Sequence, residues 1–272
     1  MTEDLALGRL NGKVAVVTGV GRLRGIGFGV ARKFAREGAA LMLTDILDGV
    51  EDCAKEIRKF GGQVISFKAD LTERAQVAEM VAKTINTFGR IDILCNVAGK
   101  SVPPRPSFLE MSDEYWHMVM DRNLLTAYYC CKIILPHMVR QRYGKVVNFS
   151  SISGVKYAYR YSAAYAASKG AVSGLTKALA LEFGEFNINV NAILPGDIDV
   201  SDDAWKPEDG PRDLGSLNAH LRPPISRPGT IDEVADLALF LSTDESAFIS
   251  GMDMVIDGGV SIVEPYPAGP KD

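Results

Sequence analysis

Short apolar runs alternate with longer amphipathic stretches along the chain of 272 residues. Seven apolar runs of six to eight residues predict buried β-strands. They cover residues 13–18, 40–45, 64–69, 91–96, 145–150, 187–194 and 252–257. Between them, apolar residues recur at the spacing of a helix face and predict helices over residues 25–37, 49–60, 72–88, 112–142, 163–183 and 231–242.

Capping and breaking residues lie near the predicted helix ends. Thr72 and Thr230 are expected to cap the helices that follow them, and Gly89 is expected to end the helix before it. Pro136 lies inside the 112–142 stretch and predicts an interruption or bend there, because proline lacks the hydrogen-bond donor that a helix interior needs.

The alternation of strands and helices predicts parallel strands joined by right-handed crossovers. The expected fold is α/β, a single Rossmann-type, doubly wound parallel sheet of about seven strands with helices on both faces. No linker or internal repeat divides the chain, so residues 1–272 are expected to form one domain. Two segments depart from the alternation, namely residues 197–227, expected to form a lid over a substrate, and a proline-rich C-terminal tail, 264–272.

Overall composition narrows the classes of partner and location. The net charge of −4, without a block of like charge, argues against a nucleic-acid partner. The N-terminus lacks the pattern of a secretory signal and no apolar run is long enough to span a membrane, so a cytoplasmic protein without a membrane partner is expected. The four cysteines are expected to be buried free thiols, and the three histidines lack ligand spacing, so no metal site is expected.

A glycine-rich turn follows the first predicted strand and opens the first predicted helix. It contains Gly19, Gly21, Gly25 and Gly27, and small residues there let a pyrophosphate approach backbone N–H groups at a helix N-terminus. A tight turn alone would also explain the glycines. Their place in a strand–turn–helix unit favours dinucleotide binding.

The end of the second predicted strand bears on the choice of dinucleotide. There the Asp45 carboxylate can accept hydrogen bonds from the adenosine ribose hydroxyls and would repel a 2′-phosphate. Arg22 and Arg24 favour the opposite choice, because they could hold that phosphate. NAD is expected, with NADP as the alternative, because the carboxylate would lie where the phosphate must go.

Tyr165 and Lys169 are the candidate catalytic pair. Their i, i+4 spacing near the start of the 163–183 helix places both side chains on one helix face. A nearby ammonium would lower the pKa of the phenol and make Tyr165 an acid or base near neutral pH. Upstream, Ser150, Ser151 and Ser153 end the fifth predicted strand, where ligands of such sheets bind.

These motifs, in this order, resemble those of the classical short-chain dehydrogenase/reductase family over residues 10–259. The set comprises the glycine turn 18–27, Asp70–Leu71, the run 96–99, Asn123, Ser151, Tyr165, Lys169, Pro195–Gly196 and the run 257–259. The glycine turn departs from the family pattern, since five residues rather than the usual three separate Gly19 from Gly25.

The resemblance implies a role for each matching residue. Tyr165 would exchange a proton with the alcohol or ketone oxygen, Ser151 would orient that oxygen, Lys169 would bind the nicotinamide ribose, and Asn123 would anchor a proton-relaying water. The implied cofactor-binding residues are Gly19, Gly21, Arg24, Gly25, Ile26, Gly27, Asp45, Asp70, Leu71, Asn96, Ala98, Gly99, Tyr165, Lys169, Pro195, Gly196 and Ile198. The resemblance also implies a homo-oligomer, either a tetramer or a dimer.

The sequence therefore predicts an oxidoreductase that transfers a hydride between NAD(H) and a small secondary alcohol or ketone. Three alternatives stay open: an NADPH-dependent ketoreductase for 3-ketoacyl thioesters, a lyase or epimerase on the same fold, and a non-catalytic dinucleotide-binding regulator. A further open point is whether Arg105, Lys156 and Arg160 bind an anionic group of the substrate or are solvated surface charges.

Overall fold

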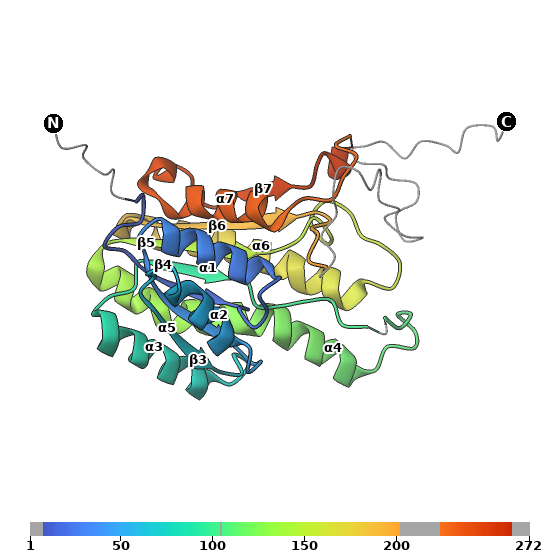
Figure 1. Ribbon diagram of the computed structural model, residues 1–272. Helices are drawn as coiled ribbons and strands as arrows, with labels where there is room; N and C mark the ends of the chain where they lie inside the picture. Colours follow the sequence, from blue (N-terminus) through green and yellow to red (C-terminus); the bar gives the residue numbers. More distant parts are fainter. Residues whose placement is uncertain (1–7, 104, 202–223, 263–272) are drawn as a thin grey trace.

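The computed structural model describes residues 8–103, 105–201 and 224–262. Its centre is a seven-stranded parallel sheet in the order β3-β2-β1-β4-β5-β6-β7 (Figure 1). The strands are β1 (Val14–Thr18), β2 (Ala40–Asp45), β3 (Val64–Lys68), β4 (Ile93–Asn96), β5 (Gly144–Phe149), β6 (Ile188–Pro195) and β7 (Asp253–Ile256). The order runs outward in both directions from the β1–β4 pair, which confirms the predicted doubly wound α/β fold.

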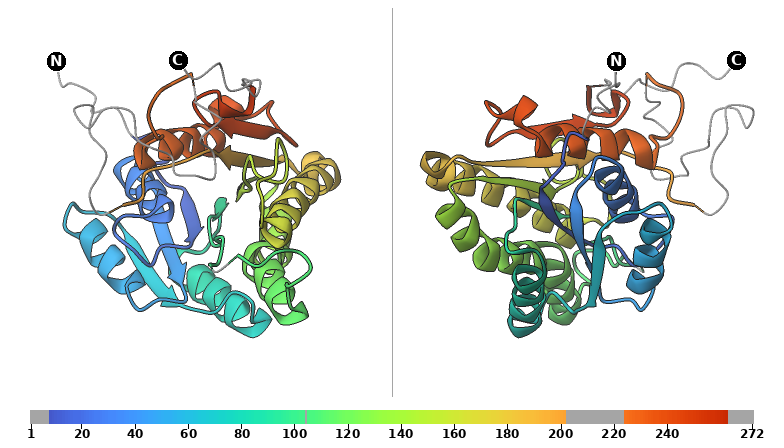
Figure 2. Two further views of the ribbon diagram at one scale, coloured as in Figure 1. Left: turned by 90° about the vertical axis from the view of Figure 1, so that its right-hand side faces the viewer. Right: turned by 60° about the vertical axis from the view of Figure 1, so that its left-hand side comes forward.

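Helices cover both faces of this sheet (Figure 2). They are α1 (Ile26–Arg36), α2 (Val50–Arg58), α3 (Arg74–Phe88), α4 (Asp113–Met120), α5 (Thr126–Gln141), α6 (Ala163–Phe183) and α7 (Ile231–Ser242). One apolar core lies under α1, α2 and α7, and the other lies under α3, α5 and α6. In β1, Ala15 and Val17 enter the first core and Val16 enters the second, which is why consecutive positions of the strand are apolar.

The parallel arrangement gathers the loops that follow the strands along one edge of the sheet, on the right in Figure 1. β1 and β4 are neighbours, although the chain visits β2 and β3 between them. The loop after β4 is held to the end of β1, because the Ala98 N–H donates to Thr18 Oγ1 at 3.0 Å. Ligands of open α/β sheets bind at such a crossing point.

The stretch 112–142 differs from its prediction. The helical pattern changes at a π-helical turn, Asp121–Leu125, between α4 and α5, whereas Pro136 lies inside α5. The side-chain amide of Asn123 in this turn donates to the carbonyls of Val119 (2.9 Å) and Lys100 (3.1 Å). The irregularity therefore serves a contact with the loop after β4, and such turns are frequent at functional sites.

Two predicted caps have different outcomes. The prediction that Thr72 caps a helix is wrong, because α3 begins at Arg74 and the Thr72 hydroxyl donates to the Asp70 carboxylate at 2.7 Å. The cap at Thr230 is confirmed: its hydroxyl accepts the Glu233 N–H, and the Glu233 carboxylate accepts the Thr230 N–H. Side-chain hydrogen bonds from Arg227 lower the pKa of Glu233 to about 2.

We expect this cap to make stability depend on pH in the acid range. The folded-state pKa of Glu233 lies below its ordinary value of 4.5, so the stabilisation is present above about pH 4.5 and is lost as the pH falls towards 2. Glu233→Gln should lower the free energy of unfolding at neutral pH by about 0.5–1 kcal/mol, a cap's contribution discounted for solvent screening. Urea unfolding at several pH values measures both effects, and an unaltered acid dependence in the variant would contradict the assignment.

Most of the predicted lid and the predicted C-terminal tail, 202–223 and 264–272, lie outside the described residues. The described parts of the lid segment are residues 197–201 and 224–227. The first part follows β6 and pairs with the segment before α7. The Gly229 N–H donates to the Asp197 carbonyl and the Asp199 N–H donates to the Gly229 carbonyl, both at 2.9 Å. The Ser201 hydroxyl donates to the Asp199 carboxylate at 2.5 Å.

Candidate active site

The glycine turn packs tightly against the loop after β4. Gly19 has φ +73°, and a Cβ there would lie 2.8 Å from the Ala98 nitrogen. A Cβ on Gly27 would collide with the Gly19 carbonyl, so packing within the protein requires both glycines. At Gly25, by contrast, a Cβ would meet only Arg22, whose carbonyl oxygen would lie at 3.5 Å. The absence of a side chain at Gly25 is therefore suited to the approach of a ligand.

Gly25 is also the N-cap residue of α1, and no side chain caps that end of the helix. The first turn of a helix presents backbone N–H groups and the positive end of the helix dipole, which together favour an anion. These residues fit the pyrophosphate of a dinucleotide. When bound, the nicotinamide of such a dinucleotide would supply or accept a hydride.

The lengthened part of the turn lies against Asp45 at the end of β2. A Cβ on Gly21 would lie 2.6 Å from the carboxyl carbon of Asp45. The carboxylate is oriented by the Leu47 N–H, which donates to its Oδ1 at 2.9 Å. Gly49, which the sequence analysis did not single out, packs beneath, since a Cβ there would clash with the Gly21 carbonyl. The extra residues of the turn thus place backbone next to the negative charge of Asp45.

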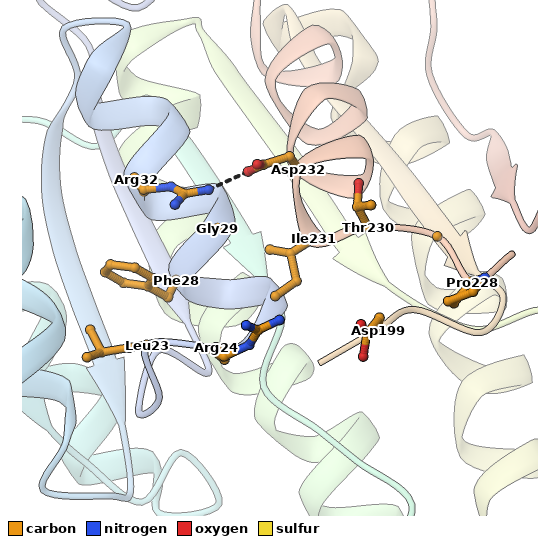
Figure 3. A pocket seen from close by; sticks show the side chains of 11 residues that line it. Leu23, Arg24, Phe28, Gly29, Arg32, Asp199, Pro228, Thr230, Ile231 and Asp232 are labelled. Atoms are coloured by element: carbon orange, nitrogen blue, oxygen red, sulfur yellow. Dashed lines mark hydrogen bonds and ion pairs between the residues drawn. The ribbon is translucent and has the colours of Figure 1, made fainter. Parts of the chain in front are cut away.

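Arg24 lies on the other side of the turn. Its side chain lines a pocket of about 260 Å³ between the N-terminal ends of α1 and α7, near Asp199 and Ile231 (Figure 3). No residue of β2 lines this pocket among the described residues. Arg22 is exposed. The structure therefore separates Arg24 from the Asp45 carboxylate, where a 2′-phosphate would have to lie.

A larger cavity, of about 530 Å³, opens at the carboxyl ends of β4, β5 and β6. The predicted site residues that line it are Ile26, Gly99, Ser151, Tyr165, Lys169, Pro195, Gly196 and Ile198. The cavity therefore joins the start of α1 to the candidate catalytic pair on α6. It has the size of a small-molecule site.

Tyr165 and Ser151 meet in this cavity. The Ser151 hydroxyl forms a hydrogen bond with the Tyr165 side chain that lowers its pKa, but burial has the larger, opposite effect and raises the pKa of Tyr165 to about 12. The expectation that Lys169 makes Tyr165 acidic is thus wrong. The reason is the desolvation of the phenol, since a buried group disfavours its charged form.

Lys169 lies beneath the tyrosine ring. Its ammonium is 5.8 Å from the ring centroid of Tyr165 and donates to the Phe149 carbonyl at 2.8 Å. The side chain is 3% exposed, and burial lowers the pKa of Lys169 to about 8. Desolvation therefore brings the titration of this ammonium close to neutral pH.

Gly99 connects Lys169 to the buried Asn123. A Cβ on Gly99 would lie 2.7 Å from Asn123 Oδ1 and 3.3 Å from Lys169 Nζ, so both groups border one backbone position. Asn123 Oδ1 is buried and accepts no hydrogen bond from another described residue. It is thus an acceptor available to a solvent molecule or a ligand.

Three further predicted cofactor residues, at the ends of β3 and β4, do not line the cavity. Leu71 is buried in the core under α3 and α5, and the Asp70 carboxylate accepts hydrogen bonds from the backbone and side chain of Thr72. Asn96 is buried between strands and donates to Asn148 Oδ1 at 2.9 Å. In this structure these side chains stabilise the strand ends that border the site.

Tertiary contacts give Ser150 and Ser153 positioning roles that the sequence did not indicate. The Ser150 hydroxyl donates to the Lys169 carbonyl at 2.7 Å and ties the start of α6 to the end of β5. The Ser153 N–H donates to Ser151 Oγ at 3.1 Å and orients that hydroxyl. Periodicity carries no signal for such contacts, because the partners are distant in sequence.

A doubly wound sheet with a glycine turn and a Tyr–Lys pair at one crevice defines the class of nicotinamide-dependent oxidoreductases. Residues 19–261 match the family described as "Enoyl-(Acyl carrier protein) reductase". The protein belongs to the short-chain dehydrogenase/reductase family of oxidoreductases, as the sequence motifs predicted.

Relatives span nearly the whole chain. The oxidoreductase UcpA of Salmonella typhimurium is 39% identical, with 97% of this chain and 100% of that protein covered. The 3-oxoacyl-[acyl-carrier-protein] reductase FabG of Thermotoga maritima is 36% identical (93% and 100% covered), and an NAD-dependent glycerol dehydrogenase of Listeria innocua is 36% identical (92% and 94% covered). A solved short-chain dehydrogenase/reductase structure from Burkholderia xenovorans has a TM-score of 0.82 at 33% identity, covering 94% of this chain and 99% of that one.

Within the described residues, no helix combines the length and apolar character needed to cross a bilayer. The same residues contain no group of three or more His, Cys, Asp or Glu side chains placed to hold a metal ion.

Proposed function

We propose that this protein transfers a hydride between NAD(H) and a small secondary alcohol or ketone, with Tyr165 as the acid or base. The observation that carries the proposal is one cavity lined by Ser151, Tyr165 and Lys169 and continuous with the start of α1 at Ile26. A proton donor, a hydrogen-bond partner for the same oxygen and a cation are what carbonyl reduction and its reverse require.

Each residue has a distinct task in this proposal. In ketone reduction the Tyr165 hydroxyl gives its proton to the carbonyl oxygen, and in alcohol oxidation the phenolate takes the hydroxyl proton. Ser151 holds that oxygen beside Tyr165. Lys169 supplies positive charge beneath the ring, and the unsatisfied Oδ1 of Asn123 holds a water that returns a proton through Lys169. Gly19, Gly25 and Gly27 border the pyrophosphate, and Gly196 and Ile198 line the nicotinamide end.

Absorbance of NADH tests the reaction class. Purified protein is assayed with NAD or NADP and a panel of secondary alcohols, sugars and hydroxy acids. Cofactor-dependent formation of NADH supports the proposal. Loss of substrate without net NADH would support a lyase or epimerase, and measurable NAD binding without turnover of any compound would support a non-catalytic regulator.

We further propose that the cofactor is NAD. In support, Asp45 lies against Gly21 at the end of β2, and Arg24 lines the pocket between α1 and α7 instead. A carboxylate there accepts hydrogen bonds from ribose hydroxyls and repels a 2′-phosphate.

Replacing Asp45 with serine should therefore shift cofactor preference towards NADP. We expect the ratio of kcat/KM for NADP to that for NAD to rise by about 10- to 100-fold, because one repulsive charge pair is removed at a partly exposed site. Asp48→Ser is the matched control, since Asp48 lies three residues further on with its side chain 89% exposed. Equal ratios in the parent protein and Asp45→Ser would contradict the assignment.

The second candidate is an NADPH-dependent reductase of 3-ketoacyl thioesters. The observation that favours it is the similarity to the FabG of Thermotoga maritima, whose name gives a 3-oxoacyl carrier-protein substrate. A parent protein that uses NADPH with a 3-ketoacyl thioester and not NADH would establish this alternative.

We also propose a cytoplasmic homo-oligomer, a tetramer or a dimer. Support comes from the four buried free cysteines, which suit a reducing compartment, and from exposed apolar side chains on the long helices, Tyr128 on α5 and Leu181 on α6. Light scattering coupled to size-exclusion chromatography measures the assembly.

A further inference from the structure

We propose that the substrate carries a carboxylate and that Arg105 binds it, so that the enzyme acts on small hydroxy or keto acids rather than on neutral alcohols. This inference rests on the proposed function, because it names the substrate class of the same cavity. Arg105 is a specificity residue here and takes no part in the proton transfer.

Arg105 lines the cavity that contains Tyr165 and is positioned by two contacts. Its Nε donates to Ser101 Oγ at 2.9 Å, and its guanidinium carbon lies 5.1 Å from the ring centroid of Tyr159. These contacts engage Nε and one face of the guanidinium group. The two terminal Nη atoms, which form the fork that binds a carboxylate in a bidentate manner, make no hydrogen bond to any other residue in the described ranges.

Among the residues that the structure describes, no carboxylate is paired with Arg105. Within the described residues it forms no ion pair, and it is half-buried. The other cation lining the cavity, Lys169, donates to the Phe149 carbonyl under Tyr165. The one lining carboxylate among the described residues, Asp197, is exposed and follows β6. A half-buried cation with open donors and no counterion among the described residues favours an anionic ligand.

The charge of Arg105 acts on the reacting group. It lowers the pKa of Tyr165, against the larger effect of burial. Arg105 and Tyr165 line the same cavity, so one small molecule can contact both. We therefore expect a short spacing between the carboxylate and the carbon that is oxidised.

The structure also separates Arg105 from the other two cations that the sequence offered. Lys156 and Arg160 are exposed, and neither lines the cavity. Arg160 lies next to Tyr159 in the chain, and its side chain is exposed. It provides a matched control, an arginine of the same region outside the site.

The test compares acids with their methyl esters. Lactate, 3-hydroxybutyrate and 4-hydroxypentanoate place the carboxylate at increasing distance from the secondary alcohol, and each methyl ester removes only the charge. Turnover with NAD is measured for the parent protein, Arg105→Gln, Arg105→Lys and Arg160→Gln. The same compounds are titrated into the protein–NADH complex, in which the alcohols bind without reacting, and NADH fluorescence gives each Kd.

We expect the parent protein to prefer at least one acid over its ester. Arg105→Gln should lower the acid-to-ester ratio of kcat/KM by about 10- to 100-fold, mainly through KM, and should weaken Kd for the acid similarly. Arg105→Lys should restore part of the ratio, because the charge remains but the fork is lost. Arg160→Gln should leave the ratio unchanged.

Two results would overturn the inference. One is a parent protein–NADH complex that binds every acid no better than its ester, whether or not a substrate turns over. The other is an equal loss for acid and ester in Arg105→Gln, which indicates a structural role only. If the protein oxidises the esters with NAD at the same kcat/KM as the acids, the proposed function stands and the carboxylate assignment fails. If the acids bind tightly through Arg105 but no NADH forms, the result instead counts against the proposed hydride transfer.

Discussion

Replacing Tyr165 with phenylalanine is expected to lower kcat/KM for alcohol oxidation and for ketone reduction by about 10³-fold or more. The change removes only the hydroxyl that exchanges the proton, and acid–base groups contribute about 10²- to 10⁴-fold in enzymes. The ring, which covers the Lys169 ammonium, is kept. The Ser151 hydroxyl keeps the Ser153 N–H as a partner, so folding should be preserved.

The matched control for this change is Tyr161→Phe. Tyr161 lies four residues before Tyr165, is 54% exposed and does not line the cavity. Initial rates with NAD, together with the melting temperature and the Kd for NAD, separate a chemical from a structural effect. A Tyr165→Phe enzyme that keeps more than about a tenth of the parent kcat/KM would contradict the assignment of Tyr165 as acid or base.

The raised pKa of Tyr165 also predicts that oxidation and reduction depend differently on pH. Oxidation needs the phenolate, and below a pKa of about 12 the phenolate fraction grows tenfold for each pH unit. Oxidation should therefore accelerate as the pH rises from about 6 to about 8. Reduction needs the protonated phenol, which is present throughout this range, so its rate should not rise with pH.

Replacing Lys169 with methionine is expected to lower kcat/KM by about 10²- to 10³-fold without destabilising the fold. Methionine has a similar length, fills the same buried volume and removes the ammonium. The Phe149 carbonyl loses a hydrogen bond worth about 1 kcal/mol, whereas removing a desolvated charge offsets that cost. Catalysis should thus change far more than the free energy of unfolding.

A pH profile distinguishes this role from a merely structural one. Because the pKa of Lys169 is lowered to about 8, the ammonium is present below that pH and is lost above it. Ketone reduction by the parent protein should fall as the pH rises through about 8, and Lys169→Met should lack this inflection. Lys177→Met, on the same helix and 56% exposed, is the control. An inflection near pH 8 that persists in Lys169→Met would assign the titration to another group.

The fold and the catalytic pair could be predicted because their signals are local in the chain. Strand β1 is apolar at its first four positions since both of its faces are buried, and that pattern is visible without any knowledge of its neighbours. The i, i+4 spacing of Tyr165 and Lys169 places them on one helix face in any fold that keeps the helix. The cap at Thr230 likewise depends only on a residue three positions away.

Contacts between distant segments decided the remaining features. The π-helical turn at Asn123 is paired with the Lys100 carbonyl, and Pro136, the local signal for a break, is accommodated inside α5. Position 21 requires glycine because a side chain there would collide with the carboxylate of Asp45, which lies at the end of β2. Three cations were equivalent in the sequence, and only the loop geometry brings Arg105 into the cavity.

By itself, the sequence determined the order of strands and helices, the family and the identity of the candidate catalytic residues, because periodicity and motif spacing are properties of neighbouring residues. Only the tertiary structure decided the sign of the Tyr165 pKa shift and the surroundings of Arg24 and Arg105. Those properties depend on how much solvent is removed from a group and on which charges lie near it. Both are set by segments that meet only when the chain has folded.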